Sequence, residues 1–227
     1  MNKKKREKIF IVDVMALAYR CFFALSRVPL RTSDGRPTGS IYAAAMIIHR
    51  LCQEERPDYL IAALDSPDPT FREAEDSDYK ANRDAMPDDL EQQLDLFPRL
   101  FKSLGCPCLA VSAYEADDII ATVKAKNTDC ELYMVSGDKD LVQLIDDKTF
   151  LYILKKDEPP LIMGVEEAKA KYCDPCQMVD YLAIVGDRSD NIPGVKGVGA
   201  VGARKLLDKY QDLEAIYDSL EEHATGV

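Results

Sequence analysis

Three short apolar runs, each followed by an aspartate, most constrain the fold of this 227-residue chain. The runs cover residues 9–12, 59–64 and 131–135, and their apolar residues are consecutive rather than alternating. Strands that are covered on both faces show this pattern. Because helical periodicity occurs between the runs, the sequence predicts an α/β fold with a mainly parallel central sheet flanked by helices.

Two stretches that differ from this pattern indicate how the chain is organised. Residues 66–86 are polar, contain Pro67 and Pro69, and are expected to form a long excursion above the sheet. The chain becomes glycine-rich after residue 187, so we expect a core at residues 1–180 and a second region at 181–227. Helices are expected at residues 15–25, 38–54, 87–104, 115–125, 203–210 and 213–220, and a further strand at 149–154.

The aspartates that follow the three strands are Asp13, Asp65 and Asp138. In an open α/β sheet, ligands bind outside the carboxyl ends of the strands, so these side chains are expected to meet at one edge. Carboxylates that lie so close cannot all ionise without a cation, and this indicates a metal site. The alternative is that each aspartate only forms a turn or caps a helix.

Further acids enlarge this candidate metal site. Glu115 opens an expected helix, where a capping box that starts at Ser112 is the simpler explanation. Oxygen ligands favour Mg²⁺ or Mn²⁺, and two such ions are suited to phosphodiester hydrolysis. The candidate metal ligands are Asp13, Asp65, Glu115, Asp117, Asp118, Asp138, Asp140, Asp187 and Asp190.

A glycine-rich segment at residues 193–199 leads into an expected helix. Backbone N–H groups that glycines expose at a helix start can bind phosphates without reading bases. The spacing of Gly194, Gly197 and Gly199 is typical of a helix-hairpin-helix that clamps DNA, although a simple glycine-rich turn is the alternative for any one pair. This segment favours DNA over RNA as the substrate.

Tyr79, Lys80 and Arg83 place an aromatic ring and two cations within five residues. This combination can stack a base and neutralise a scissile phosphate, so we predict a catalytic role for all three. A solvated loop without such a role is the alternative. The candidate DNA-binding residues are Arg20, Arg72, Gly194, Lys196, Gly197, Gly199, Arg204 and Lys205.

Composition limits the other classes of function. With two histidines, catalysis built on a histidine base or on several histidine ligands is disfavoured. The net charge of −11 argues against nucleic-acid binding, but the nine acids of the candidate site account for most of the excess. Cys106, Cys108, Cys173 and Cys176 could form a zinc site, a minor alternative to reduced thiols. No apolar run is long enough for a membrane helix or an export signal, so we expect a cytoplasmic protein.

Six motifs together carry a resemblance to a known family: residues 18–20, 71–72, 79–83, 114–118, 137–140 and 186–194. The chain resembles the 5′-nuclease (5′→3′ exonuclease) domain of bacterial DNA polymerase I, within the wider flap endonuclease family. The resemblance implies a PIN-like core with a helical arch at about residues 66–90, and a C-terminal helix-hairpin-helix that can bind K⁺. In this family one metal lies among the acids that match Asp13, Asp65, Glu115, Asp117 and Asp118, and the second among those that match Asp138, Asp140, Asp187 and Asp190.

The resemblance also implies an activity and its partners. The activity is 5′→3′ exonuclease and 5′-flap endonuclease cleavage of DNA in replication and repair, with two Mg²⁺ (or Mn²⁺) ions. Its substrates are DNA with a 5′ flap or 5′ end and RNA primer–DNA junctions, and a DNA polymerase is a candidate partner. The expected protein is a bacterial monomer in the cytoplasm, associated with the nucleoid.

The chain departs from the family pattern at several positions. Val14 replaces a glycine, Leu64 replaces a common phenylalanine, and residues 73–76 lack the usual histidine and tyrosine. Residues 201–203 are Val-Gly-Ala where the family usually has Lys-Thr-Ala, so one basic phosphate contact is missing. The chain also ends before helices that normally follow. A stand-alone nuclease, a degenerate copy, a fragment and a catalytically weak or inactive DNA-structure-binding module therefore stay open.

Overall fold

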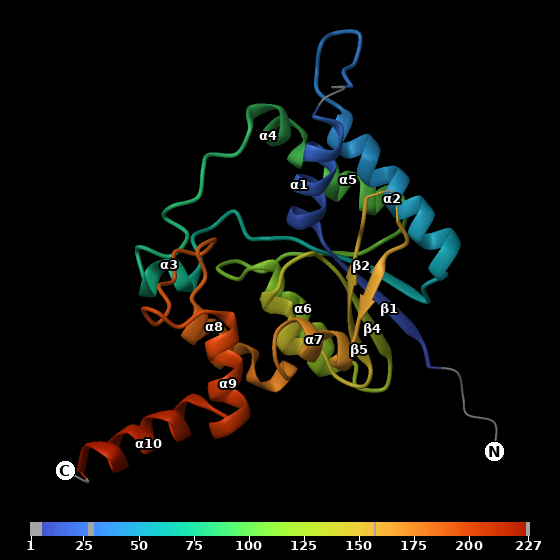
Figure 1. The fold of residues 1–227 in the computed structure, drawn as a ribbon. Coiled ribbons are helices and arrows are strands. Elements are labelled where there is room, and N and C mark those ends of the chain that lie inside the picture. The colour runs from blue at the N-terminus through green and yellow to red at the C-terminus, as the bar shows by residue number, and fades with distance from the viewer. Residues whose placement is uncertain (1–5, 27–29, 157, 226–227) are drawn as a thin grey trace, which may run out of the picture.

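A six-stranded sheet in the order β3–β2–β1–β4–β5–β6 forms the centre of the computed structural model, which describes residues 6–26, 30–156 and 158–225 (Figure 1). The strands expected at residues 9–12, 59–64, 131–135 and 149–154 are confirmed, whereas β6 was not predicted. The strands are β1 (Lys8–Asp13), β2 (Tyr59–Ala63), β3 (Cys108–Leu109), β4 (Glu131–Val135), β5 (Thr149–Ile153) and β6 (Leu161–Met163).

Five of these strands run in the same direction. β1 pairs in parallel with β2 and β4, and the parallel pairing continues outward to β3 and β5. Only β6, on β5, is antiparallel. The carboxyl ends of β1, β2 and β4 therefore lie at one edge of the sheet, and the expected mainly parallel α/β fold is confirmed.

Helices cover both faces of the sheet (Figure 1). α1, α2, α4 and α5 pack on one face, and α6 to α9 pack on the other. The α-helices are α1 (Val14–Leu25), α2 (Gly39–Glu55), α3 (Phe71–Glu75), α4 (Asp88–Leu94), α5 (Leu96–Ser103), α6 (Ala116–Lys126), α7 (Val165–Lys171), α8 (Met178–Val185), α9 (Ala200–Tyr210) and α10 (Leu213–Thr225). Two short 3₁₀ helices are η1 (Asp140–Leu144) and η2 (Pro175–Gln177).

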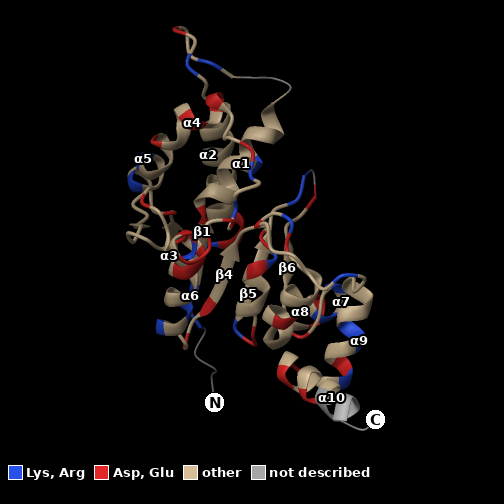
Figure 2. Cartoon of the chain, turned by 90° about the vertical axis from the view of Figure 1, so that its left-hand side faces the viewer, with Lys and Arg blue, Asp and Glu red and all other residues tan. Residues whose placement is uncertain are grey.

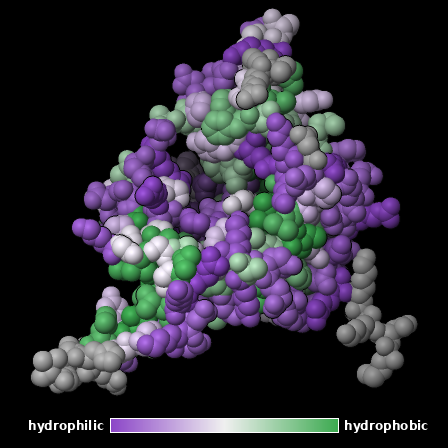
Figure 3. All heavy atoms as spheres, in the orientation of Figure 1, coloured by the Kyte–Doolittle hydropathy of each residue, from purple (hydrophilic) through white to green (hydrophobic). Residues whose placement is uncertain are grey.

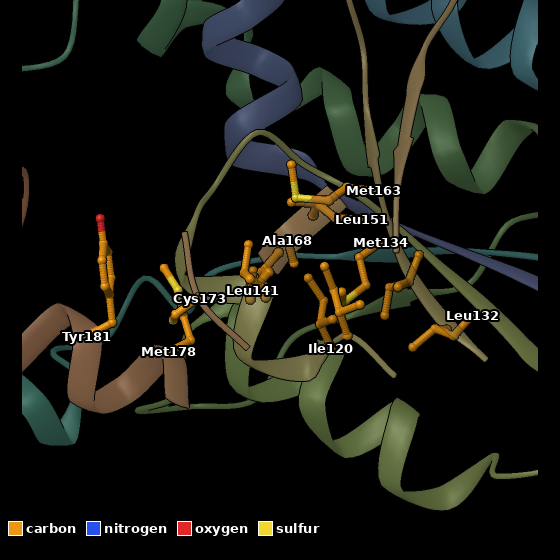
Figure 4. Packing of buried hydrophobic residues seen from close by; sticks show 14 of the residues in the cluster. Ile120, Leu132, Met134, Leu141, Leu151, Met163, Ala168, Cys173, Met178 and Tyr181 are labelled. Carbon is orange, nitrogen blue, oxygen red and sulfur yellow. The ribbon is translucent and has the colours of Figure 1, made fainter. Parts of the chain in front are cut away.

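Alternate residues of β1 belong to two separate hydrophobic cores. Phe10 and Val12 pack with α1 and α2, while Ile9 and Ile11 pack with α6 and α8. Phe10 is fully buried and stacks on Tyr133 with ring centroids 4.6 Å apart. Burial of such a side chain stabilises the fold by about 2–3 kcal/mol. The second core, which extends from β4 and β5 to α8, is shown in Figure 4.

The single helix expected at residues 87–104 is wrong, because the structure has two helices there. α4 ends at Leu94 and α5 begins at Leu96. Pro98 explains the break, since proline lacks an N–H group and its ring clashes with the carbonyl of the residue four positions earlier. That residue is Leu94, where α4 ends.

The excursion at residues 66–90 is less helical than the expected arch. α3 begins at Phe71 and ends after one turn, and the preceding Thr70 caps it through a capping box with Glu73. Turns follow, and Lys80 adopts the left-handed conformation with φ 57°. This segment crosses the space between α3 and α4 (Figure 1). Its helical parts are therefore α3 and the beginning of α4.

A tight loop at residues 186–194 folds back against the end of α8. Asp187 and Ile192 exchange backbone hydrogen bonds of 2.9 and 2.8 Å, and Gly186 has φ 81°. The backbones of Gly186 and Gly194 are in close contact, since a Cβ atom on Gly194 would lie 2.3 Å from the carbonyl carbon of Val185. Glycine at both positions lets this loop close.

We expect Gly194→Ala to lower the free energy of unfolding by about 3 kcal/mol, because the added Cβ meets backbone atoms that cannot move independently. Urea unfolding would measure this loss. Gly137→Ala is the control, since a Cβ there meets nothing within 4 Å. Equal stabilities of the two variants would contradict the close packing of Gly194.

The two parts into which we expected the chain to divide share a hydrophobic core. Residue 180, the expected boundary, lies inside α8, and apolar residues of α8 pack in the same core as β4. The division into two domains therefore stays a prediction. So does the helix-hairpin-helix, whose expected segment joins α8 to α9. None of the described helices is both long and apolar enough to cross a membrane.

Candidate metal centre

The aspartates at the ends of β1 and β2 are held by the first turns of helices. Asp13 caps α1: its Oδ1 accepts a hydrogen bond of 2.9 Å from the N–H of Ala16, and its Oδ2 accepts one of 2.9 Å from Ser136 Oγ. Asp65 Oδ1 accepts one of 2.8 Å from the N–H of Ala116, at the start of α6. Both carboxylates therefore accept hydrogen bonds at helix starts, and metal binding by them stays a prediction.

Asp117, in the first turn of α6, lies among other carboxylates. Burial raises its pKa to about 8, and the charges of Asp13, Asp138, Glu115 and Asp65 add to this rise. Burial also raises the pKa of Asp13 to about 6, with smaller contributions from Asp65 and Asp138. The structure thus places Asp13, Asp65, Glu115 and Asp117, four of the five predicted ligands of the first group, near one another.

A second group of acids consists of Asp140, Asp187 and Asp190. Each offers a carboxylate oxygen, and these oxygens lie within 4.8 Å of one another. Oδ1 of Asp140 is buried and has no hydrogen-bond partner among the described residues. Burial raises the pKa of Asp140 to about 6, and the neighbouring Asp138 contributes to this rise. An oxygen-only site with an unpartnered buried oxygen fits a hard divalent cation.

Asp138 lies between the two groups. Its charge acts on Asp13 and Asp117 in the first group and on Asp140 in the second. Its Oδ1 accepts a hydrogen bond of 2.9 Å from the N–H of Asp140. Figure 2 shows the acidic residues gathered at the ends of the central strands, with basic residues among them.

The predicted catalytic cations pair with these acids. Lys80 Nζ lies 2.8 Å from Glu115 Oε1, and Arg83 Nη2 lies 2.6 Å from Asp190 Oδ1. The hydroxyl of Tyr79 is 3.3 Å from a carboxylate oxygen of each of these two acids. Burial first, and then the charges of Glu115 and Asp190, raise the pKa of Tyr79, so its hydroxyl stays protonated. All three predicted catalytic residues therefore lie at the acid cluster.

Two cavities open on the acids. One, of about 520 Å³, is lined by Tyr79, Asp117, Asp140 and Asp190, among others. The other, of about 470 Å³, is lined by Arg20, Asp138 and further residues. Hydrophilic side chains surround a hollow near the middle of the face in Figure 3. Acids of both groups thus line cavities of the protein.

Comparisons with known proteins identify the family to which this chain belongs. The family model described as 5′-3′ exonuclease, N-terminal resolvase-like domain, matches residues 8–173. The model of the 5′-3′ exonuclease C-terminal SAM fold matches residues 173–226. The chain belongs to the 5′-3′ exonuclease family.

Relatives of known sequence agree with this membership in the 5′-3′ exonuclease family. The chain is 38% identical to DNA polymerase I of Caldicellulosiruptor bescii over 97% of its own length and 26% of that protein. It is 37% identical to the 5′-3′ exonuclease of Aquifex aeolicus over 94% of its length and 73% of that protein. The chain thus spans about a quarter of the polymerase relative but most of the exonuclease.

Solved structures share the fold. The bacteriophage T5 flap endonuclease, in a complex with DNA and metal ions, has a TM-score of 0.75 at 22% identity. That match covers 94% of this chain and 79% of the phage protein. Flap endonuclease-1 of Methanococcus jannaschii has a TM-score of 0.63 at 17% identity, over 96% of this chain and 74% of that one.

Asp118 and Arg72 form a structural ion pair within this family fold. Both nitrogens of the Arg72 fork lie 2.8 Å from the Asp118 carboxylate, one on each oxygen. This hydrogen bonding holds the pKa of Asp118 below its usual range. Asp118 Oδ2 also accepts a hydrogen bond of 3.0 Å from the N–H of Glu115. Metal binding by Asp118 and DNA binding by Arg72 stay predictions.

Of the expected DNA-binding residues, only Arg20 and Arg72 line the two cavities that open on the acids. Gly197 has φ 84°, Gly199 caps α9, and a Cβ on either would meet nothing within 4 Å. Lys196 and Lys205 are exposed and form no ion pair among the described residues. Gly194 closes the loop that carries Asp187 and Asp190. Arg204 Nη1 donates a hydrogen bond of 3.4 Å to the carbonyl of Ala170.

Lys139 and Ser136 are polar residues of the site that we did not single out from the sequence. Lys139 Nζ lies 2.5 Å from Asp187 Oδ2 and 3.6 Å from Asp140 Oδ1. Ser136 Oγ donates to Asp13 and accepts from the N–H of Asp138. The sequence feature that could have indicated a role for Lys139 is its position between two predicted ligands, Asp138 and Asp140.

The departures of this chain from the family pattern at Val14 and Leu64 do not displace the acids. Val14 is the first residue of α1, is 4% exposed and packs in the core with α2. Leu64 packs against the same core. Val201, by contrast, is 64% exposed in the first turn of α9, where a basic residue is usual.

The zinc alternative is wrong. All seven cysteines are free, and they belong to different parts of the fold. Cys106 and Cys108 pack against the core with α5, whereas Cys173 lies in the core on the opposite face of the sheet. Within the described ranges, the only group of three or more close potential metal ligands is the trio of Asp140, Asp187 and Asp190.

Asp117→Asn is expected to make the metal-free protein more stable at pH 8 than the wild type, by several degrees in Tm. The unfolded chain loses the Asp117 proton near pH 4, whereas burial and neighbouring acids keep it on the folded protein up to about pH 8. The wild type therefore loses stability as the pH rises through this window, and the variant lacks this loss.

Thermal unfolding in EDTA at pH 5 and pH 8 measures the effect of Asp117→Asn. Asp129→Asn, a change of an exposed acid, is the matched control. A variant Tm at pH 8 equal to or below that of the wild type would show that Asp117 is not crowded by carboxylates.

Proposed function

We propose that this chain is a divalent-metal-dependent 5′→3′ exonuclease and 5′-flap endonuclease that hydrolyses DNA phosphodiesters in replication and repair. The observation that carries the proposal is the pair of acid groups joined by Asp138 at the carboxyl edge of the sheet. Lys80 and Arg83 lie beside them. Such an arrangement suits phosphoryl transfer, where catalysis consists of positioning and charge stabilisation.

Two divalent ions, Mg²⁺ or Mn²⁺, fit these acids. When bound, they supply an activated water and neutralise charge on the leaving oxygen. We propose that Asp13, Asp65, Glu115 and Asp117 hold one ion, with Asp118 as a further candidate. Asp138, Asp140, Asp187 and Asp190 hold the other.

The residues of the polar excursion act on the substrate. Lys80 and Arg83 pair with Glu115 and Asp190 at 2.8 and 2.6 Å. A scissile phosphate that enters the cavity offers these cations new acceptors, so they can stabilise the charge that develops during cleavage. Tyr79, which stays protonated, can donate a hydrogen bond or stack on a base.

The duplex is held away from the acids. We propose that the exposed backbone around Gly197 and Gly199, together with Lys196 and Lys205, binds DNA phosphates as a helix-hairpin-helix and takes K⁺. Arg20 lines the second cavity, and we propose that it contacts a phosphate there. Arg72, Gly194 and Arg204 complete the proposed DNA-binding set.

The substrates are DNA with a 5′ flap or 5′ end and RNA primer–DNA junctions, and the protein acts at the nucleoid as a monomer. A DNA polymerase is the proposed partner, because the DNA polymerase I relatives carry the matching region in a longer chain. The DNA complexes of structurally similar flap endonucleases support DNA as the substrate.

A DNA-structure-binding module without turnover is the second candidate function. It is motivated by the departures from the family pattern, among them Val201, which exposes an apolar side chain where the family usually has a lysine. The second candidate requires binding of branched DNA without cleavage.

Product mapping tests the proposed function. A 5′-flap DNA labelled at its 5′ end, incubated with Mg²⁺, is expected to release a fragment cut near the flap junction, whereas a 3′-flap DNA stays intact. A 5′-recessed duplex is expected to lose short 5′ products. Binding of the 5′-flap DNA without either product would support the second candidate instead.

A further inference from the structure

Two asparagines connect the segment that carries the cations with the loop that carries two of the acids. Asn82 Nδ2 donates a hydrogen bond of 2.7 Å to the carbonyl of Arg188. Asn191 Nδ2 donates one of 2.8 Å to the carbonyl of Asp78. The bonds are reciprocal, because each side-chain amide reaches from its own segment to the backbone of the other, across more than a hundred residues of sequence.

A backbone hydrogen bond lies between these two contacts. The N–H of Lys80 donates to the carbonyl of Asp190, 3.1 Å away. Lys80 and Arg83 thus lie on either side of Asn82, and Asp190 directly precedes Asn191. The asparagines therefore hold the backbone from which the two cations and one of the acids extend.

These hydrogen bonds differ in kind from the ion pairs beside them. The pairs of Lys80 with Glu115 and of Arg83 with Asp190 depend on carboxylates that metal ions also require. Metal binding at Glu115 and Asp190 therefore competes with the ion pairs. The hydrogen bonds from the side-chain amides of Asn82 and Asn191 are accepted by backbone carbonyls. Neither a metal ion nor a phosphate therefore competes for these acceptors through charge.

We propose that Asn82 and Asn191 are positioning residues that hold residues 78–83 against residues 187–191 while the metal ions and the substrate occupy the acids. Held in this way, Lys80 and Arg83 stay within reach of the scissile phosphate after their ion pairs have been broken. This inference rests on the proposed function for its catalytic part, whereas the connection between the segments can be tested without activity.

The backbone at Asn191 decides which variants are informative. Asn191 has φ 62°, a left-handed conformation that asparagine and aspartate tolerate better than other residues with a side chain. Asn191→Asp keeps this tolerance and removes the amide donor. Asn82 is exposed and has no such constraint, so Asn82→Ala is suitable. Asn127→Ala is the control, since the side-chain amide of Asn127, which directly follows α6, donates a hydrogen bond of 2.7 Å to the carbonyl of Val123 in that helix.

Hydrogen–deuterium exchange of the full chain with Ca²⁺ tests the connection. Asn82→Ala and Asn191→Asp are each expected to raise the exchange rate in peptides covering residues 76–86 several-fold, because the amide of Lys80 loses its protection. Asn127→Ala is expected to leave these peptides unchanged. Unchanged exchange in both test variants would overturn the proposal, whatever the activity of the protein.

Steady-state cleavage of 5′-flap DNA in Mg²⁺ tests the catalytic part. Both variants are expected to lower kcat about tenfold with KM within about twofold of the wild type, because the cations are less well placed for the chemical step. Faster exchange with an unchanged kcat, or a raised KM at constant kcat, would overturn the positioning role. Absence of cleavage by the wild type would contradict the proposed function, and exchange would then decide the proposal alone.

Discussion

Asp138→Asn is expected to lower the rate of Mg²⁺-dependent cleavage of 5′-flap DNA by at least about a thousandfold. Asp138 is the acid whose charge acts on both groups of the metal centre. Its replacement removes a full negative charge from the point where the proposed ions approach each other. The asparagine oxygen can still accept the hydrogen bond from the N–H of Asp140, so the fold is expected to persist.

The effect of Asp138→Asn is measured by single-turnover cleavage, with DNA binding followed separately in Ca²⁺. Asp65→Asn is expected to lose cleavage in the same way while both variants still bind the DNA. Asp147→Asn is the matched control, because this exposed acid precedes β5 at the opposite edge of the sheet. Wild-type cleavage by Asp138→Asn and Asp65→Asn would exclude the proposed metal centre.

Lys80→Ala is expected to slow the cleavage step by about a hundred- to a thousandfold. In other enzymes, the loss of a donor that stabilises transition-state charge has an effect of this size. Lys80 Nζ lies 2.8 Å from Glu115 Oε1, at the wall of the acid cluster. A scissile phosphate bound between the ions and residues 79–83 would therefore meet this ammonium group.

Single-turnover rates at saturating enzyme separate this loss from weaker binding. Lys126→Ala is the control, since Lys126 is exposed at the end of α6 and forms no ion pair among the described residues. A wild-type single-turnover rate for Lys80→Ala would remove this residue from the mechanism.

The centre of the fold and the position of the acids could be predicted because local rules determine them. Buried parallel strands appear as consecutive apolar residues, and Asp13, Asp65 and Asp138 follow three of them. Parallel pairing then brings their ends to one edge. The family resemblance added the grouping of the acids, and the metal assignment of each residue stays a prediction.

Most other features of the structure depend on contacts between distant residues, which no local sequence pattern predicts. β6 is a three-residue strand that forms only by pairing with the edge of β5. The break between α4 and α5 follows from the clash of the Pro98 ring with the carbonyl of Leu94. The segment after α3 is not helical, and several of its side chains contact residues about a hundred positions away in the sequence. The hydrogen bond from Asn82 to the carbonyl of Arg188 is an example. Such pairings between distant segments become visible only in the folded chain.

We propose that the acids at the carboxyl edge of the sheet bind divalent ions and that the protein cuts DNA there. Cleavage of a 5′-flap DNA labelled at its 5′ end, measured across a Mg²⁺ titration with EDTA and a blunt single strand as controls, tests this proposal most directly. We expect cleavage near the flap junction that rises with Mg²⁺ and disappears in EDTA. Cleavage that persists in EDTA, or intact flap DNA at every Mg²⁺ concentration, would contradict it.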